Sequence, residues 1–176
     1  MSSVYLCGFM GCGKSHIGRQ LAAAMGRKFA DLDKVIVDGE GMTIPEIFDK
    51  FGEPHFRELE AKYIRELSDG YIVATGGGAL INDETAAFAR RSGLTVYLNA
   101  SFDTCYERIK GDTNRPLVMN NTPEKLRELY NVRAEIYRRN SECMVNGDAR
   151  DTTIVDEIAK LADYYEKNGS INKDRT

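Results

Sequence analysis

Of the 176 residues, 42% are hydrophobic and 29% are charged, which is typical of a globular protein. A chain of this length is expected to form one domain, over residues 1–176, with a single hydrophobic core. No apolar run approaches the roughly 20 residues that cross a bilayer, so an integral membrane protein is excluded and no membrane partner is expected. The net charge of −3 lacks the basic excess that phosphate-backbone binding requires, so no nucleic acid partner is expected either.

The N-terminal segment predicts a strand, a glycine-rich loop and a helix in succession. Residues 4–7 form a short apolar run, and from Ile17 onward apolar residues recur at helical spacing until Gly26 can cap the helix. Between the two elements, residues 8–15 read GFMGCGKS. This matches GxxxxGK[ST] in the strand-to-helix context that a phosphate-binding loop requires.

The loop is therefore expected to bind a nucleotide with Mg²⁺. Its glycines let backbone N–H groups converge on phosphate oxygens, Lys14 neutralises the β and γ charge, and the Ser15 hydroxyl is offered to the metal. The alternative is a glycine-rich turn with an incidental lysine. The candidates for nucleotide binding here are Gly11, Cys12, Gly13, Lys14, Ser15 and His16.

A second strand over residues 29–33 is predicted from its alternation of apolar and polar side chains. Asp31 and Asp33 lie two apart, so on a strand their carboxylates point the same way. Like charges held together need a cation or hydrogen-bond donors nearby, and a Mg²⁺-dependent phosphoryl-transfer site supplies both. A solvated strand end is the alternative.

Two helical segments are predicted next. Thr43 starts a capping box that opens a helix, which Gly52 stops, and Pro54 restarts a second helix. On that second helix, Arg57 and Glu60 are spaced i, i+3, so Glu60 can hold the Arg57 guanidinium in place. An ordinary surface ion pair is the alternative.

A buried type of strand over residues 71–74 runs into TGGG at residues 75–78. Three glycines in a row cost backbone entropy unless something must approach the backbone closely. A ligand beside Gly76, Gly77 and Gly78 is the functional interpretation, and a plain tight turn is the alternative.

The remainder continues the alternation of helices and strands. The predicted elements are a helix over 83–91, a strand over 94–98, a helix over 101–109, a polar mobile lid over 111–122, a helix over 122–137, a weaker strand over 142–145, a helix over 154–165 and a frayed tail from about 168. Such alternation predicts a three-layer α/β/α fold, in which helices cover both faces of a parallel sheet and ligands bind at the carboxyl ends of its strands.

Three single arginines are candidates for anion binding. In an acidic chain, a negatively charged substrate needs local guanidinium groups, whose planar forks bind carboxylate or phosphate at two points. The candidates are Arg57, Arg115 in the lid and Arg133. Each of them is otherwise an ordinary surface charge.

Together, these motifs resemble the shikimate kinase family, in order and spacing, from Val4 to Tyr137. The residues that carry the resemblance are GFMGCGKS at 8–15, DLD at 31–33, FRELE at 56–60, TGGG at 75–78, RPL at 115–117 and RAEIY at 133–137. The resemblance implies a P-loop kinase fold like that of nucleoside monophosphate kinases, with a five-stranded parallel sheet. It also implies transfer of the γ-phosphoryl group of ATP to the 3-hydroxyl of shikimate.

By the same resemblance, Asp33 holds and can deprotonate the accepting hydroxyl, and Asp31 supports Mg²⁺ through water. Lys14 and the lid residue Arg115 act on the phosphates, where Arg115 closes over them and stabilises transition-state charge. The implied catalytic residues are thus Lys14, Asp33 and Arg115, and the implied metal residues are Ser15 and Asp31.

The resemblance also implies a substrate side and an adenine side. Arg57 and Arg133 would grip the shikimate carboxylate, and Gly77, in the middle of the glycine triplet, would contact substrate through its backbone. Arg108 and Arg150 would lie near the adenine, although the segment over residues 146–151 departs from the family pattern.

Two rival functions share part of this pattern. A gluconate or nucleoside monophosphate kinase has the phosphate loop but gives no reason for DLD, FRELE and GGG to occur together. A non-catalytic ATP-binding module needs no catalytic charges, yet Lys14, Ser15 and Asp33 are all present.

We expect a cytoplasmic monomer. The N-terminal residues show neither a basic segment nor a cleavage-site pattern of the kind that marks a signal peptide. The four cysteines lack metal-ligand spacing and are interpreted as reduced structural thiols. They are Cys7, Cys12, Cys105 and Cys143.

Overall fold

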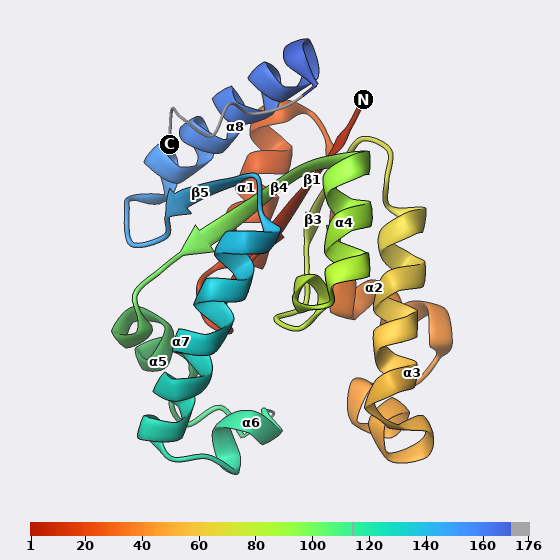
Figure 1. The fold of residues 1–176 in the computed structure, drawn as a ribbon, viewed down its shortest axis with the longest axis vertical. Helices are drawn as coiled ribbons and strands as arrows, with labels where there is room; N and C mark the ends of the chain where they lie inside the picture. Colours follow the sequence, from red (N-terminus) through yellow and green to blue (C-terminus); the bar gives the residue numbers. More distant parts are fainter. Residues whose placement is uncertain (114, 170–176) are drawn as a thin grey trace.

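Five parallel strands form one sheet at the centre of the computed structural model, which describes residues 1–113 and 115–169 (Figure 1). The sheet order is β2-β3-β1-β4-β5, and every neighbouring pair is parallel. The strands are β1 (Ser3–Cys7), β2 (Lys28–Asp31), β3 (Tyr71–Ala74), β4 (Gly93–Asn99) and β5 (Cys143–Asn146). The predicted five-stranded parallel sheet is confirmed.

Helices cover both faces of this sheet. The helices α1 and α8 pack together on one face, and α4 and α7 pack on the other, where α3 lies against α4 (Figure 1). The helical elements are α1 (Lys14–Met25), α2 (Leu32–Glu40), α3 (Ile44–Glu66), the short 3₁₀ helix η1 (Ala79–Ile81), α4 (Asp83–Ser92), α5 (Phe102–Ile109), α6 (Pro116–Met119), α7 (Pro123–Asn140) and α8 (Asp151–Asn168). The three-layer α/β/α prediction is confirmed. Across the described residues, no helix is both long and apolar enough to span a membrane.

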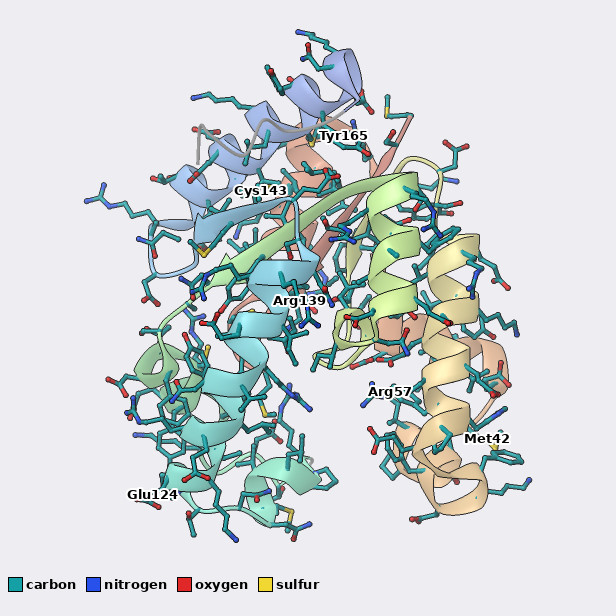
Figure 2. All side chains as sticks on the ribbon, viewed as in Figure 1. Met42, Arg57, Glu124, Arg139, Cys143 and Tyr165 are labelled. Carbon is teal, nitrogen blue, oxygen red and sulfur yellow. The ribbon has the colours of Figure 1, made fainter. Side chains whose placement is uncertain are left out.

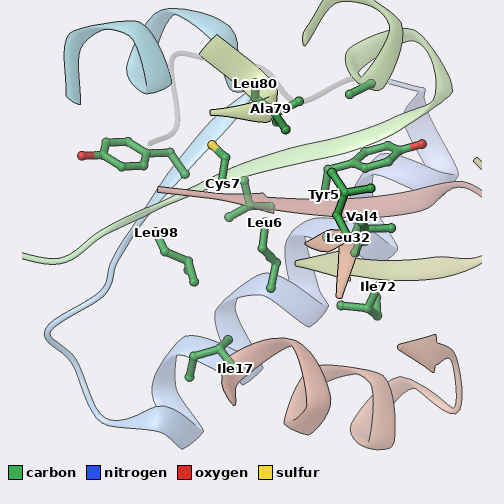
Figure 3. Close-up of a cluster of buried hydrophobic side chains, with 14 of the residues drawn as sticks. Val4, Tyr5, Leu6, Cys7, Ile17, Leu32, Ile72, Ala79, Leu80 and Leu98 are labelled. Atoms are coloured by element: carbon green, nitrogen blue, oxygen red, sulfur yellow. The ribbon is translucent and has the colours of Figure 1, made fainter. Parts of the chain in front are cut away.

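The core is built around the central strand β1, all of whose residues are buried. Successive side chains leave a strand on opposite faces. Figure 3 shows this for Leu6, which points toward Ile17 of α1, and Cys7, which points away from it toward Leu80. Because both faces are covered, residues 4–7 of β1 are apolar without alternation, as is usual for a parallel strand.

Local signals set several boundaries. In the capping box that opens α3, the Thr43 backbone N–H donates to Glu46 Oε2 at 2.7 Å, and the Glu46 N–H donates to Thr43 Oγ1 at 3.4 Å. Gly52, with φ 81°, interrupts the helix between its two halves. The helix α1 ends at Gly26, which has a left-handed φ of 63°. These three predictions are confirmed.

One sequence prediction needs correction. The second strand ends at Asp31 rather than at Asp33, because Leu32 and Ile36 are buried one helical turn apart and place Asp33 in the first turn of α2. The lid contains the short helix α6, where Pro116 supplies the φ of a first helical residue.

The tail predicted from about residue 168 adjoins the end of α8. Asn168 is the last residue of α8, and the N–H of Gly169, in a left-handed conformation, caps that helix by donating to the Tyr165 carbonyl. The remaining residues of the predicted tail, 170–176, lie outside the described part of the chain, as does Asn114 in the lid.

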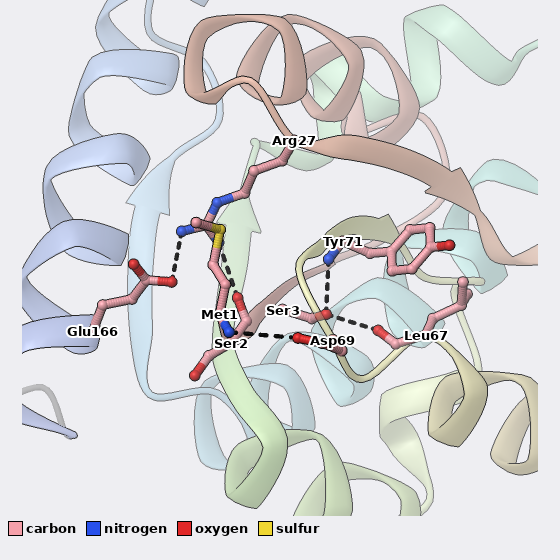
Figure 4. A network of polar contacts seen from close by, with 8 residues as sticks. All are labelled: Met1, Ser2, Ser3, Arg27, Leu67, Asp69, Tyr71 and Glu166. Carbon is pink, nitrogen blue, oxygen red and sulfur yellow. Dashed lines mark hydrogen bonds and ion pairs between the residues drawn. The ribbon is translucent and has the colours of Figure 1, made fainter.

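A polar network fastens the amino ends of the strands (Figure 4). The Ser3 hydroxyl donates to the Leu67 carbonyl at 2.8 Å and accepts from the Tyr71 N–H at 3.0 Å. Arg27, whose side chain is only 4% exposed, pairs with Glu166 of α8 at 2.8 Å. This network lies at the amino ends of the strands. The carboxyl ends, where ligands are expected, are at the opposite edge of the sheet and take no part in it.

Candidate active site

The phosphate-binding loop lies between the carboxyl end of β1 and the N-terminus of α1. Gly11 and Gly13 adopt φ angles of 80° and 100°, which L side chains rarely tolerate. The Lys14 ammonium is folded back onto the loop and donates to the carbonyls of Gly8 at 2.8 Å and Phe9 at 3.1 Å. An ammonium held on two carbonyls in this way is placed to exchange them for phosphate oxygens.

Hard oxygen ligands meet where α1 and β2 come together. The Ser15 hydroxyl donates to Asp31 Oδ2 at 2.5 Å, which joins the first turn of α1 to the last residue of β2. The described residues contain no group of three or more His, Cys, Asp or Glu side chains that could hold a metal by themselves. This donor set fits Mg²⁺, which usually takes one or two protein oxygens and completes its octahedron with phosphate oxygens and water.

Asp33 is the second carboxylate of this edge. It is supplied by the first turn of α2 and lines the same cleft as Asp31 and Lys14. Burial raises the pKa of Asp33, the negative charge of Asp31 adds to this effect, and the cations Lys14, Arg115 and Arg57 oppose it. A half-buried carboxylate among cations, with a raised pKa, is suited to accept a hydrogen bond or a proton from a hydroxyl group.

The glycine triplet after β3 leaves room for charged side chains on neighbouring elements. A Cβ on Gly76 would lie 2.7 Å from Asp33 Oδ1 and 2.9 Å from Glu60 Oε1, and a Cβ on Gly78 would lie 2.1 Å from Arg57 Nη1. Gly77 is less constrained, because the nearest atom to its Cβ would be Arg133 Nη1 at 3.7 Å. Close approach of side chains to the backbone thus explains the glycines at positions 76 and 78, whereas position 77 has only ordinary contacts.

Arg57 is held by two carboxylates on its own helix. Its Nη1 donates to Glu60 Oε2 at 2.6 Å, and its Nη2 donates to Glu53 Oε1 at 2.9 Å. Figure 2 shows Arg57 on the side of α3 that is turned toward α7. Burial raises the pKa of Glu60 to about 7, against the opposing charge of Arg57. The predicted Arg57–Glu60 contact is present, and Glu60 is 1% exposed, so it is not an ordinary surface pair.

Arg133 enters from α7 on the other side of the triplet. It is half-buried, and it makes no ion pair or side-chain hydrogen bond within the part of the chain that the structure describes. One helical turn further along, Tyr137 donates from its hydroxyl to the Gly77 carbonyl at 2.5 Å. An unpaired guanidinium beside exposed peptide groups is the environment that an anionic ligand requires.

The residues predicted to lie near the nucleotide are not all close to the phosphate-binding loop. Arg108 of α5 donates to the Gly11 carbonyl at 3.0 Å, and His16 pairs through Nε2 with Asp151 at 2.6 Å. Arg150, in contrast, is exposed at the start of α8 and does not line the cleft. The structure therefore brings Arg108 and His16 to the loop but leaves Arg150 outside it.

One cleft of about 280 Å³ gathers most of the predicted residues. Arg115 reaches it from the lid, where it also pairs with Asp112 at 2.8 Å. Cys12 is buried, with its sulfur 3.7 Å from the Lys14 ammonium, so its contribution to the loop is its backbone. The predicted residues that line the cleft are Gly11, Gly13, Lys14, Ser15, His16, Asp31, Asp33, Gly76, Gly77, Arg108 and Arg115.

Sequence reasoning missed three contributors. Thr75 lines the cleft, and its hydroxyl donates to the Leu6 carbonyl at 2.9 Å, which ties the start of the triplet to β1. Glu53 was detectable from its i, i+4 spacing to Arg57. The ring of Tyr137 packs on Tyr97, and its hydroxyl contact with Gly77 had no signal in the sequence.

Comparison with known proteins identifies close relatives. A family profile described as Shikimate kinase matches residues 10–163. The chain is 41% identical over 169 residues to a shikimate kinase of Geobacter sulfurreducens, covering 94% of this chain and 92% of that protein. It is 43% identical over 178 residues to a shikimate kinase of Thioalkalivibrio sulfidiphilus, covering 98% and 90% respectively.

Solved structures agree. The shikimate kinase of Acinetobacter baumannii in complex with shikimate superposes with a TM-score of 0.85 at 34% identity, covering 96% of this chain and 95% of that one. A gluconokinase of Sinorhizobium meliloti superposes with a TM-score of 0.59 at 20% identity, covering 95% and 97%. The second likeness extends to the fold alone.

Proposed function

This chain belongs to the shikimate kinase family, and we propose a division of labour within its cleft for the transfer of the γ-phosphoryl group from ATP to the 3-hydroxyl of shikimate. The chain is an ATP-dependent kinase that phosphorylates a hydroxyl of shikimate. What the proposal adds is the assignment of this chain's residues to the parts of that reaction.

The substrate carboxylate is assigned to the two sides of the glycine triplet. The observation that carries this assignment is the pair of guanidinium groups, Arg57 from α3 against Gly78 and Arg133 from α7 against Gly77. Arg57 is already fixed by Glu60, whereas Arg133 has no ion-pair partner among the described residues. A carboxylate between them can bind the Arg57 guanidinium, which Glu60 already orients, and the Arg133 guanidinium, which is not engaged by another described side chain.

Asp33 is assigned to the accepting hydroxyl. Its half-buried carboxylate lies beside Gly76, lines the same cleft as Lys14 and interacts electrostatically with Arg57. A loose phosphoryl-transfer transition state needs little proton removal, so Asp33 orients the hydroxyl first and accepts its proton as the new O–P bond forms. The leaving ADP oxygen departs on the side of Lys14 and Arg115, which balance its charge.

The phosphates are assigned to the loop and the lid. Lys14 exchanges its two carbonyl partners for β and γ oxygens, and Arg115 moves from Asp112 onto the transferring group as the lid closes. Ser15 would offer its hydroxyl to Mg²⁺ and Asp31 would support the ion through water; when bound, Mg²⁺ would neutralise charge on the β and γ phosphates. Arg108 and His16 flank the nucleotide.

The proposal also covers the oligomeric state, the compartment and the partners of the enzyme. We infer that it acts as a cytoplasmic monomer on a small-molecule substrate, without a nucleic acid or membrane partner. The four cysteines are free thiols, which suits a reducing compartment. All parts of the site are supplied by one chain, so a second copy is not needed to complete it.

Acceptor exchange in one assay tests the proposal. ADP release from MgATP is measured with shikimate, gluconate, nucleoside monophosphates or no acceptor. We expect turnover with shikimate alone. Turnover with another acceptor would keep the nucleotide side and discard the roles given to Arg57 and Arg133, and ATP binding without turnover would indicate a non-catalytic module.

A further inference from the structure

Tyr137 is a buried tyrosine whose hydroxyl reaches the glycine triplet. The residue is 1% exposed, and its ring packs on Tyr97 of β4 with centroids 5.4 Å apart. Its hydroxyl donates to the Gly77 carbonyl at 2.5 Å, across 60 residues of sequence. Burial raises the pKa of Tyr137, so the hydroxyl keeps its proton and remains a donor at neutral pH.

This hydrogen bond fixes a peptide plane. A trans peptide is planar, so its carbonyl and the following N–H point in opposite directions. No cis peptide occurs in the described residues. With the Gly77 carbonyl turned to Tyr137, the N–H of Gly78 is turned away from α7. Neither Gly77 nor Gly78 donates its N–H to an acceptor within the described residues, and Gly77 lines the cleft.

The same helix carries the free guanidinium. Arg133 and Tyr137 are spaced i, i+4 and therefore lie on one face of α7. A Cβ on Gly77 would lie 3.7 Å from Arg133 Nη1 and 3.8 Å from the Tyr137 hydroxyl. One rigid helix face thus holds both the Arg133 guanidinium and the orientation of the adjacent loop.

Glycine makes such a restraint necessary. Successive glycines have more backbone freedom than any other residues, so the Gly77–Gly78 peptide would rotate readily if nothing held it. The neighbouring bonds from the Ala79 N–H to the Gly76 carbonyl and from the Ile81 N–H to the Gly78 carbonyl fix only the ends of this peptide pair. The Tyr137 hydroxyl supplies the restraint in the middle.

We propose that Tyr137 is a positioning residue for the acid substrate, whose hydroxyl fixes the orientation of the Gly77–Gly78 peptide beside the Arg133 guanidinium, so that the substrate carboxylate meets a loop of one defined shape. This assignment rests on the proposed function, in which that carboxylate belongs to shikimate. It places no chemistry on the phenol, because the hydroxyl acts through the loop.

Tyr137→Phe, compared with Tyr165→Phe, tests the assignment. Both changes remove a tyrosine hydroxyl that donates to a main-chain carbonyl, and Tyr165 bonds to Arg90 at 3.3 Å, outside the site. We expect Tyr137→Phe to raise the KM for shikimate about tenfold and to leave the KM for ATP within about twofold. We expect Tyr165→Phe to change neither KM, although both variants lose some thermal stability.

Two further readouts separate a positioning role from a structural one. Shikimate alone should stabilise wild type and Tyr165→Phe against heating but stabilise Tyr137→Phe less, whereas ATP alone should stabilise all three proteins equally. An unchanged KM for shikimate in Tyr137→Phe, or parallel increases in both KM values, would overturn the assignment. Failure of wild type to turn over shikimate would instead overturn the proposed function, and this assignment with it.

Discussion

The carboxyl groups of Asp33 and Glu60 meet at Gly76, where an added Cβ would lie 2.7 Å from Asp33 Oδ1 and 2.9 Å from Glu60 Oε1. Glu60 is buried and Asp33 is half-buried, and removal from water raises the pKa of each. Glu60 Oε1 has no hydrogen-bond partner within the described residues. Two carboxyl groups this close together resist simultaneous ionisation, so protons bound to this pair should influence substrate binding.

The first prediction concerns pH. Glu60, with a pKa of about 7, gains its proton as the pH falls through neutrality and then holds Arg57 less strongly. We expect the KM for shikimate to rise about five- to tenfold between about pH 8 and about pH 6. Glu60→Gln should have a raised KM that varies little over this range. Steady-state kinetics at each pH measure the effect.

Glu53→Gln is the matched control for that experiment, because Glu53 also binds Arg57 but is exposed. It should keep the wild-type pH dependence, and a flat wild-type profile would contradict the prediction.

The free energy of unfolding should depend on pH in the opposite direction to substrate binding. The pKa of Glu60 rises from 4.5 in the unfolded chain to about 7, so its contribution is full at low pH and is lost as the pH rises through 7.

The second prediction concerns the triplet. A Cβ at position 78 would lie 2.1 Å from Arg57 Nη1, so Gly78→Ala must displace the guanidinium, whereas Gly77→Ala makes only ordinary contacts. We expect Gly78→Ala to lower kcat/KM for shikimate about 10²-fold and Gly77→Ala to lower it less than about threefold. Equal losses in the two variants would show that the effect comes from backbone freedom rather than from Arg57.

The third prediction concerns Asp33. Replacing it by asparagine removes the half-buried charge that Asp31 opposes, so the free energy of unfolding should hold or increase. Turnover should fall about 10²- to 10⁴-fold, because the accepting hydroxyl loses its carboxylate partner. ATP binding measured by calorimetry should be unchanged. A near-normal rate would remove Asp33 from the mechanism.

The fourth prediction concerns Arg133. A lysine there keeps the charge but cannot reproduce the two-point contact of a guanidinium, so Arg133→Lys should raise the KM for shikimate about tenfold. Arg138→Lys is the control on the same helix, because Arg138 is exposed and pairs only with Glu135 among the described residues. It should behave like wild type. An unchanged KM in Arg133→Lys would count against the carboxylate grip.

Much of the fold was predictable because its signals are local. The strand over Tyr71–Ala74 was predicted to the residue, and the Thr43 capping box and the Gly52 break act within a few positions. The start of α2 gave no such signal, because its N-cap, Asp31, makes no side-chain capping bond. Alternation up to Asp33 therefore indicated a strand, although the turn of α2 still brings Asp33 to the cleft.

The site residues that belong to a sequence motif could be predicted from the sequence. Those whose role depends on a contact between distant parts of the chain could not. Lys14 and Ser15 follow from the loop motif, and Glu60 follows from its spacing to Arg57. The partner of the Tyr137 hydroxyl is 60 residues away, so only the folded chain shows it. The position of Arg150 could not be predicted from the sequence either. Its exposed place at the start of α8 depends on how the preceding loop folds.

The order of the strands has a consequence for local unfolding. The phosphate loop follows β1, which is paired on both sides, whereas Asp31 ends β2, which is an edge strand paired only with β3. Edge elements open with a smaller free-energy cost than central ones. Amide hydrogen exchange should therefore be faster in Lys28–Asp31 than in Ser3–Cys7, and brief openings of the edge would release the metal-side carboxylate while the loop that holds ATP keeps its shape.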